Sequence, residues 1–168
     1  IDPDVVADEV KRLREVVQWA KTKLLDLEHS TEKRLGAVEA RIFEPQLLML
    51  EDHTLVESAV RYVRENRLSA ARAIDWRMLE LQALWSRTAH PMVLDRINDL
   101  QDLQVRLLHQ LLELPDPTDV STLGEDAIVV TKNLTPSLTV QLDPESVLGI
   151  AADQGTRTAH WVMLARSL

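Results

Sequence analysis

The sequence predicts a mainly α protein with a small α/β part at its C-terminal end. Apolar residues recur at helical spacing through most of the chain before Leu114. Glycine, phenylalanine and tyrosine are scarce, with four, one and one copies among 168 residues, whereas leucine and alanine are abundant. A short β-branched run appears beyond residue 126. We therefore expect an antiparallel helical bundle over residues 1–114 and an α/β subdomain over residues 115–168.

A long amphipathic helix opens the chain. Asp2-Pro3 is a start signal, and Asp4, Asp8 and Glu9 lie where the helix dipole is positive. The apolar positions follow steps of four and three residues and are Val6, Val10, Leu13, Val17, Ala20, Leu24 and Leu27. A break is expected near Ser30, which offers a partial capping signal.

Four more helical stretches follow in the predicted bundle. They cover about residues 31–50, with an interruption at Glu44-Pro45, then residues 53–66, 69–90 and 91–113. Short connections between them favour antiparallel packing. Trp19, Trp76 and Trp85 lie within these stretches and are expected to pack between helices.

Two prolines and acidic residues in the segment 114–119 mark a boundary. Beyond it, residues 127–130 and 147–152 are predicted to form strands buried on both faces. Thr135-Pro136 opens a short helix between them, ending near Leu142. This order of strand, helix and strand, followed by a loop and a last helix, indicates an α/β unit.

The charge pattern excludes several classes of partner. The net charge is −8, so no basic field exists to hold nucleic acid or an anionic membrane surface. No apolar run approaches the roughly 20 residues that span a bilayer, and no signal-peptide pattern opens the chain. The sequence has no cysteine, which excludes disulfides and thiolate chemistry and fits a cytoplasmic location. A basic protein is the partner that an acidic chain favours.

His160 is the candidate catalytic residue. It follows Gly155 and Thr158 in the loop after the second predicted strand, in the first turn of the last predicted helix. Unpaired N–H groups and the helix dipole favour an anion there and disfavour a charged imidazole. A neutral ring beside an anion site, with Arg157 and Arg166 close in sequence, suits a nucleophile toward a phosphoryl group. The same spacing also fits a histidine with a structural role.

Three segments resemble enzyme I of the bacterial phosphotransferase system. The tail Gly155-Thr156-Arg157-Thr158-Ala159-His160, followed by Ala165-Arg166-Ser167-Leu168, is similar to its signature Gly-Gly-Arg-Thr-Ser-His…Ala-Arg-Ser-Leu. Residues 39–52 are similar to its stretch Glu-Ala-x-Ile-Phe-Glu-Ala-His-x-x-Met-Leu-x-Asp, and residues 134–139 to its Leu-Thr-Pro-Ser-x-Thr. Phosphoenolpyruvate synthase and pyruvate phosphate dikinase share the tail pattern, and the helical segment favours enzyme I over them.

The resemblance implies roles for individual residues. His160 would accept a phosphoryl group from phosphoenolpyruvate through Nε2 and pass it to a histidine of the carrier protein HPr. Thr139 would hold the histidine ring, and Arg157 and Thr158 would support the phosphoryl group. Arg166 is either a charge stabiliser or a plain surface residue.

The resemblance also places the partner-binding site on the helical bundle, with Phe43, Glu44, Glu51 and Asp52 as candidates. The acidic candidates suit HPr, because HPr presents basic residues around its own histidine. A solvated helix face explains each of these acidic residues equally well. The α/β part would be an incomplete swivelling phosphohistidine subdomain, since strands should precede Ile1 and follow Leu168. The barrel domain that binds phosphoenolpyruvate and magnesium is absent, so we expect no metal in this chain and a homodimer only for the intact enzyme. His29, His53, His90 and His109 have no metal-ligand spacing.

The sequence also departs from the enzyme I pattern. Gln46 stands where a histidine is usual, Thr156 replaces a glycine, Ala159 replaces a serine, and Trp161 follows the nucleophile. Two other hypotheses therefore stay open. The chain could be a helical protein-interaction module with a structural His160, or the same domain of a fused or nitrogen-related enzyme I relative.

Overall fold

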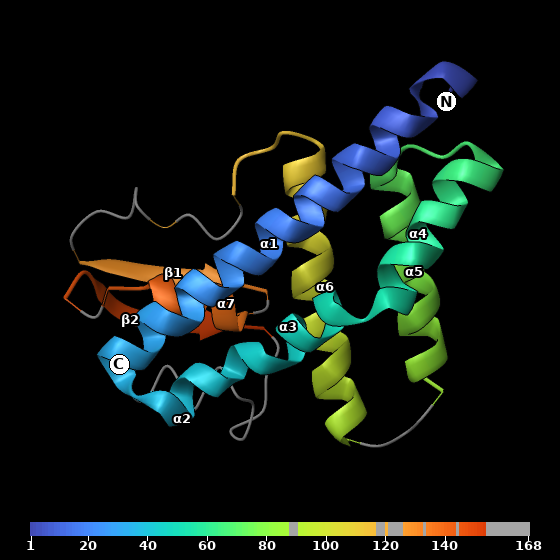
Figure 1. Cartoon of the computed structure of the whole chain (residues 1–168). Coiled ribbons are helices and arrows are strands. Elements are labelled where there is room, and N and C mark those ends of the chain that lie inside the picture. The colour runs from blue at the N-terminus through green and yellow to red at the C-terminus, as the bar shows by residue number, and fades with distance from the viewer. Residues whose placement is uncertain (88–90, 117–119, 121–125, 133, 144, 154–168) are drawn as a thin grey trace. The chain divides into compact units, whose positions relative to one another are not determined.

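The computed structural model describes residues 1–87, 91–116, 120, 126–132, 134–143 and 145–153 (Figure 1). It is mainly helical with one small sheet, which confirms the predicted fold class. The helical elements are η1 (Pro3–Val5), α1 (Val6–Leu35), α2 (Ala37–Ala40), η2 (Arg41–Phe43), α3 (Glu44–Glu51), α4 (His53–Asn66), α5 (Ala70–Trp85), α6 (Pro91–Leu111) and α7 (Pro136–Gln141). The strands are β1 (Ala127–Thr131) and β2 (Val147–Ala152). The last predicted helix lies outside the described residues.

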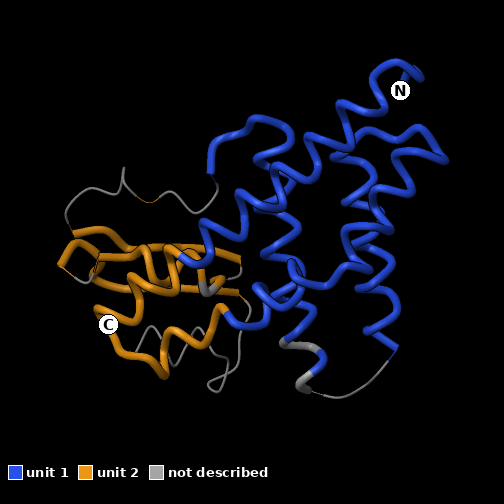
Figure 2. The backbone as a smooth tube through the Cα atoms, viewed as in Figure 1, with its two compact units in different colours: residues 1–25, 44–117 blue, residues 26–43, 118–168 orange. Residues whose placement is uncertain are grey.

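The chain forms two compact units (Figure 2). Unit 1 contains residues 1–25 and 44–117, and unit 2 contains residues 26–43 and 118–168. This grouping differs from a sequential division after residue 114, because the last third of α1, together with α2 and η2, groups with the β1–α7–β2 segment. A helix of 30 residues, about 45 Å long, is long enough to contribute to both units.

Helix α1 does not break near Ser30, where the sequence analysis placed an interruption. The Ser30 hydroxyl donates to the Leu27 carbonyl at 3.0 Å, so its side chain is satisfied within the helix instead of capping a new one. The helix ends at Leu35 because Gly36 adopts φ 113° and ψ 168°, a conformation open almost only to glycine.

The other predicted helix boundaries follow the capping chemistry. Pro45 lies in the first turn of α3, where no backbone donor is needed, and the predicted interruption at Glu44-Pro45 is confirmed. Asp52 caps α4, and Ser69 caps α5 by accepting from the Arg72 N–H at 3.3 Å. Helix α5 ends at Trp85 and does not continue to His90-Pro91, since Ser86 closes it as the C-cap.

Unit 1 is a helical bundle in which α5 packs on both α4 and α6, and α3 also packs on α4 and α6. Its core is aliphatic. Buried side chains of this unit include Val10, Leu13, Ala20, Leu24, Leu55, Val63, Ile74, Met78, Leu100 and Leu107. The expected packing role of Trp76 is wrong, because 53% of this residue is exposed. Its ring lies beside that of Tyr62 on α4, with the centroids 6.5 Å apart.

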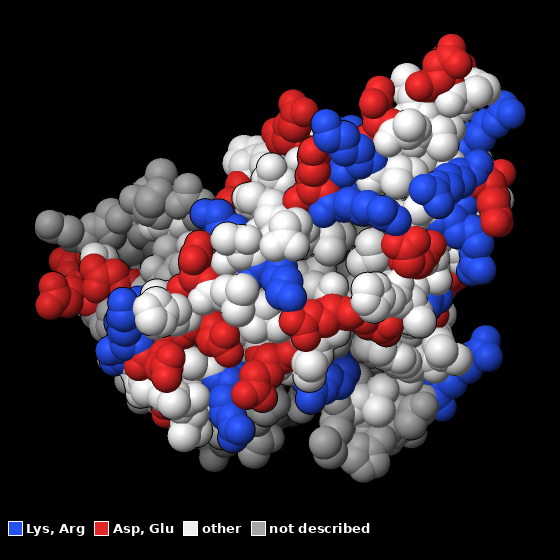
Figure 3. All heavy atoms as spheres, in the orientation of Figure 1, with Lys and Arg blue, Asp and Glu red and all other residues white. Residues whose placement is uncertain are grey.

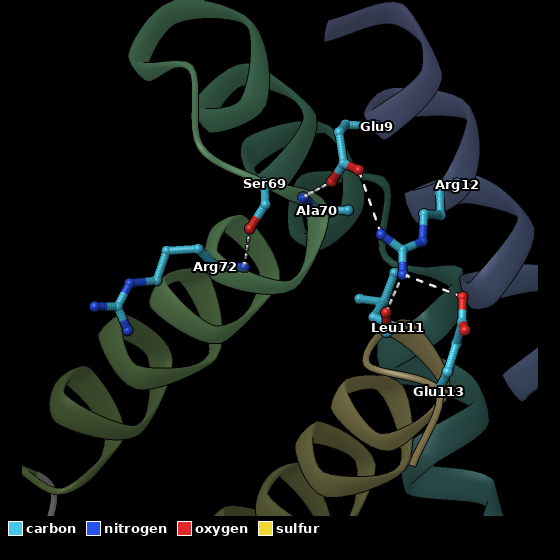
Figure 4. Close-up of polar contacts among 7 residues, drawn as sticks. All are labelled: Glu9, Arg12, Ser69, Ala70, Arg72, Leu111 and Glu113. Carbon is cyan, nitrogen blue, oxygen red and sulfur yellow. Dashed lines mark hydrogen bonds and ion pairs between the residues drawn. The ribbon is translucent and has the colours of Figure 1, made fainter. Parts of the chain in front are cut away.

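Two side chains of α1 bind the ends of other helices in unit 1 (Figure 4). Glu9 accepts from the Ala70 N–H at 2.5 Å, at the start of α5, and pairs with Arg12 at 3.3 Å. Arg12 donates to the Leu111 carbonyl at the end of α6 and lies 3.9 Å from Glu113. The anion thus meets a helix N-terminus and the cation a helix C-terminus, as the helix dipoles favour.

In unit 2, β1 and β2 are parallel neighbours, and the predicted order of strand, helix and strand is confirmed. Ile128 is opposite Gly149 and Val130 is opposite Ala151. The expectation of strands buried on both faces is wrong, since Ile128, Val130 and Leu148 are 67–79% exposed. Burial alternates along β1 and is irregular along β2, where Leu148 and Ala151 are exposed. The face of β1 that carries Ile128 and Val130 is therefore open, and a β-branched run alone does not specify how many faces are covered.

Gly36 and Gly149 provide a matched test of the backbone at the end of α1. We expect Gly36→Ala to lower the free energy of unfolding by about 1–3 kcal/mol, because a Cβ is strained at φ 113° and would lie 3.2 Å from Glu39 Oε2. Gly149→Ala should change it by less than about 0.5 kcal/mol, since a Cβ there meets nothing within 4 Å. Urea unfolding of both variants checks this, and equal losses would contradict the assignment.

Candidate functional site

The catalytic candidates divide between described and undescribed residues. His160, Arg157, Thr158 and Arg166 lie outside the residues that the structure describes. Thr139 is described and lies in α7, between the two strands of unit 2. Thr139 and its surroundings are therefore the part of the candidate site that the structure describes.

The Thr139 side chain is fully buried, and its hydroxyl donates to the Thr135 carbonyl at 2.8 Å. A hydroxyl has one proton and two lone pairs. The hydroxyl proton of Thr139 is engaged in the hydrogen bond to the Thr135 carbonyl. Only the lone pairs of this hydroxyl can therefore interact with another side chain. Thr139 is thus an acceptor, suited to an N–H group such as that of an imidazole.

Helix α7 is short, and contacts at both ends hold it in place. Thr135 caps its start by accepting from the Leu138 N–H at 3.2 Å. At its other end, Arg34 of α1 donates to the Val140 carbonyl at 2.8 Å, which satisfies one of the free carbonyls of the last turn. Arg34 and α7 belong to the same unit. These contacts fix the backbone that carries Thr139.

The four predicted partner-binding residues differ in what they can offer. Phe43 is fully buried, so its side chain belongs to the core and is not available to a partner. Glu44, Glu51 and Asp52 are exposed. Glu51 pairs with Lys21 at 2.7 Å, whereas Asp52 has no ion pair among the described residues. Unlike Glu51, Asp52 therefore carries a charge that no ion pair with a described residue neutralises.

Two bonds from Thr54 hold Asp52 in place. The Thr54 hydroxyl donates to Asp52 Oδ1 at 2.7 Å, and the Thr54 N–H donates to the same atom at 2.8 Å. Both bonds favour the carboxylate and hold the pKa of Asp52 below its ordinary value of 3.8. Asp52 is therefore charged at neutral pH and has a fixed orientation at the start of α4.

An open groove of about 410 Å³ lies next to Asp52 in unit 1. Its apolar walls are Pro45, Leu48 and Met49 of α3, Trp85 of α5 and Val93 of α6. Asp52 and Arg96 supply its charges, and Arg96 lies 3.7 Å from Asp99. This groove was not predicted from the sequence, because three helices contribute its lining and no single helix carries a residue pattern that indicates a groove.

Acidic and basic side chains are interspersed over the face of the molecule drawn in Figure 3. This face carries no large field of one sign of charge. Among the described residues, no helix has the length and apolar character needed to cross a membrane. No group of three histidine, cysteine or acidic side chains in the described ranges is placed to hold a metal ion.

Comparison with known families covers most of the chain. Residues 1–96 match the family described as PEP-utilising enzyme, N-terminal, and residues 123–168 match the one described as PEP-utilising enzyme, mobile domain. The chain belongs to the PEP-utilising enzymes. The resemblance to enzyme I is confirmed, because similar curated proteins are named phosphoenolpyruvate-protein phosphotransferase.

Two of these relatives show how much of such an enzyme the chain represents. The Haemophilus influenzae protein is 33% identical over 168 residues, which is all of this chain and 29% of the relative. The Staphylococcus epidermidis protein is 30% identical over 165 residues, which is 97% of this chain and 28% of the relative. This PEP-utilising enzyme chain thus spans less than a third of the length of the curated relatives.

Solved structures share the fold of this PEP-utilising enzyme chain. A solution structure of an Enzyme I protein superposes with a TM-score of 0.79 and 27% identity, covering 99% of this chain and 67% of the other. The N-terminal domain of a protein titled Enzyme 1 - Nitrogen superposes with a TM-score of 0.67 at 19% identity. The second likeness shows the fold alone.

Gln46 marks where this PEP-utilising enzyme departs from the histidine that is usual in enzyme I. Its side chain is fully buried, and its Nε2 donates to Asp102 Oδ2 on α6 at 2.8 Å. Within the described part of the chain, Gln46 Oε1 has no hydrogen-bond partner. The amide thus supplies a donor to Asp102, as an imidazole N–H can, but it cannot become charged. The α3–α6 contact at this position therefore does not depend on protonation of residue 46.

Asp52 allows its cap and its charge to be tested separately. Asp52→Ala should lower the free energy of unfolding by about 1 kcal/mol at neutral pH, while Asp52→Asn, which can still accept from Thr54, should cost less. Because the pKa of Asp52 is lowered in the folded state, its stabilising contribution is complete above pH 3.8 and is lost as the pH falls through the lowered value.

Chemical unfolding of the wild type and both variants, at neutral pH and below pH 3.8, measures these differences. The difference in free energy of unfolding between the wild type and Asp52→Ala should be smaller in acid than at neutral pH. The difference between Asp52→Asn and Asp52→Ala should not shrink in acid. An equal loss in both variants at neutral pH would show that Asp52 does not act as a cap.

Proposed function

We propose that this chain is the phosphoryl-carrying and partner-docking part of a phosphoenolpyruvate–protein phosphotransferase. His160 carries the phosphoryl group on Nε2 and exchanges it with a histidine of HPr. One observation carries this proposal: the N-terminal and mobile-domain families match in order along one chain, and the mobile-domain match includes His160.

The Thr139 geometry is compatible with reaction through Nε2. The Thr139 hydroxyl donates to the Thr135 carbonyl and can still accept, and we assign Nδ1–H of the His160 ring as its donor. A proton held on Nδ1 leaves the Nε2 lone pair free to attack phosphorus. The threonine thus acts as a positioning residue that selects the tautomer, while His160 forms the bond.

In the exchange with phospho-HPr, the P–N bond of the HPr phosphohistidine breaks as the bond from phosphorus to His160 Nε2 forms. Overall, the His160 ring gives up one proton and the released HPr imidazole takes up one. The two rings need an in-line approach with the phosphoryl charge stabilised by nearby donors. Arg157 and Thr158, which precede His160 in the sequence, are the proposed donors.

The longer enzyme supplies the remaining chemistry. In enzyme I, which this chain resembles, phosphoenolpyruvate and Mg²⁺ bind to a separate barrel domain. The chain alone should therefore not react with phosphoenolpyruvate, and it should exchange with phospho-HPr instead. The acidic net charge of −8 suits HPr, which presents basic residues around its histidine.

Incubation with radiolabelled phospho-HPr tests the proposal. We expect an acid-labile label on the wild-type chain and none on His160→Ala, with both proteins giving the same circular dichroism spectrum. A folded wild-type chain that takes no label would contradict the proposal, as would a label that survives in His160→Ala.

The same assay tests the positioning role of Thr139. Thr139→Val removes the acceptor and should slow labelling by about 10–100-fold, the range seen when second-sphere partners of histidine ligands are removed. Thr139→Ser keeps the hydroxyl and should retain most of the rate. The Thr135 carbonyl still accepts from the residue 139 N–H at 2.9 Å in both variants, so their stabilities should remain close. Equal rates for valine and serine would contradict the role.

A further inference from the structure

Helix α7, which carries Thr139, is too short to hold its position alone. It spans six residues, and isolated helices shorter than about 12 residues are marginal in water. The carbonyls of its last turn also lack partners within the helix. The Thr139 carbonyl accepts from the Leu142 N–H at 3.2 Å, and the Val140 carbonyl accepts from Arg34 Nη1 at 2.8 Å. Arg34 thus ties the end of α7 that carries Thr139 to the long helix α1.

The guanidinium of Arg34 also acts on the turn that starts β2. In this turn, the Asp143 carboxylate accepts from the Glu145 N–H at 3.0 Å and from the Ser146 hydroxyl at 2.9 Å. These two hydrogen bonds lower the pKa of Asp143 most, and the positive charge of Arg34 lowers it further. The Asp143 carbonyl accepts from the Val147 N–H at 2.9 Å, so this turn sets where β2 begins.

Arg34 therefore lies at the connection between α7 and β2, within unit 2. Helix α7 carries Thr139, and β2 leads in the sequence to the loop that contains His160. A cation attracts a carbonyl oxygen and a carboxylate alike. One guanidinium can thus hold the end of α7 and the start of the β2 turn at a fixed distance from each other.

We propose that Arg34 is a positioning residue for phosphoryl transfer through His160. It holds the α7–β2 connection on α1, which fixes the distance between the Thr139 hydroxyl and the His160 ring. Arg34 acts through α7 and forms no bond in the reaction. This inference rests on the proposed function, and it adds a residue that lies 106 positions before its contact at Val140.

Two other cations of α1 provide matched controls. Lys33, the residue before Arg34, is exposed and has no hydrogen bond or ion pair with another described residue. Arg14 is an arginine of the same helix, but it pairs with Glu57 in unit 1 at 2.8 Å. Replacing either residue by alanine removes one positive charge, as Arg34→Ala does, but leaves the Arg34 contact with Val140 intact.

Labelling of the whole 168-residue chain by radiolabelled phospho-HPr tests the proposal. Arg34→Ala should slow labelling by about three- to tenfold, less than Thr139→Val, because it shifts the acceptor without removing it. Arg34→Lys keeps a charged donor and should recover most of the rate. Lys33→Ala and Arg14→Ala should label within about twofold of the wild type. Each rate is divided by the folded fraction from circular dichroism, so a loss of stability alone does not produce this result.

The nitrogen chemical shifts of the His160 ring give a second readout that a merely structural role would not move. At a pH where the ring is neutral, Thr139 should hold its proton on Nδ1 in the wild type. Arg34→Ala should lower the Nδ1–H population, so that the Nδ1 signal in ¹⁵N spectra of the chain alone moves toward the unprotonated position. Lys33→Ala should leave this signal unchanged.

The outcomes separate this inference from the proposed function. If the wild type takes label and Arg34→Ala labels equally fast, or keeps the wild-type Nδ1 signal, the Arg34 assignment is wrong and the His160 assignment stands. If Lys33→Ala slows labelling as much as Arg34→Ala, the loss of charge explains the effect and the inference is also wrong. If the folded wild type takes no label, the proposed function fails, and with it the role of Arg34 in phosphoryl transfer.

Discussion

The relative position of α5 and α6 is the constraint on which the groove of unit 1 depends. Glu9 and Arg12 of α1 bind the start of α5 and the end of α6. Between these ends, the Gln82 amide donates to Gln104, which in turn donates to Asp75 at 2.7 Å. The groove residues Trp85, Val93 and Arg96 lie at the opposite ends of the same two helices. The shape of the groove is therefore set by polar contacts distant from it, with the aliphatic core supplying most of the stabilisation.

Much of the fold could be predicted because its signals are local. Ser69, the Glu44-Pro45 pair and Thr135-Pro136 act within one turn of their own positions, and the helices that they start or interrupt agree with expectation. Ser30 shows the limit, since a hydroxyl that could cap a new helix is also satisfied by a carbonyl one turn back. The open face of the sheet shows another limit, because Val130 has the same β propensity whether or not a second layer covers it.

The candidate site also combines features that could be predicted from the sequence with features that could not. The position of His160 in the sequence and the resemblance to enzyme I named His160, and the resemblance alone named Thr139. The structure adds that the buried Thr139 hydroxyl donates to the Thr135 carbonyl and so has only its lone pairs left for another group, which no sequence pattern shows. Asp52 could be named from the sequence, but its lack of an ion pair could not. That depends on a long-range contact, in which Lys21 pairs with Glu51, 30 residues away from it, and not with Asp52. The groove was out of reach, since Leu48, Trp85 and Val93 come together only when three helices pack.

We propose that the helical unit binds a basic phosphocarrier and that His160 exchanges the phosphoryl group with it. Chemical-shift mapping of the ¹⁵N-labelled chain, titrated with unlabelled HPr, is the decisive measurement of the binding step. We expect the largest changes at the Trp85 indole N–H and at the amides of Leu48, Met49 and Asp52, with the Trp76 indole N–H unmoved. Changes centred on Trp76 and Tyr62, or no changes at saturating HPr, would contradict the account.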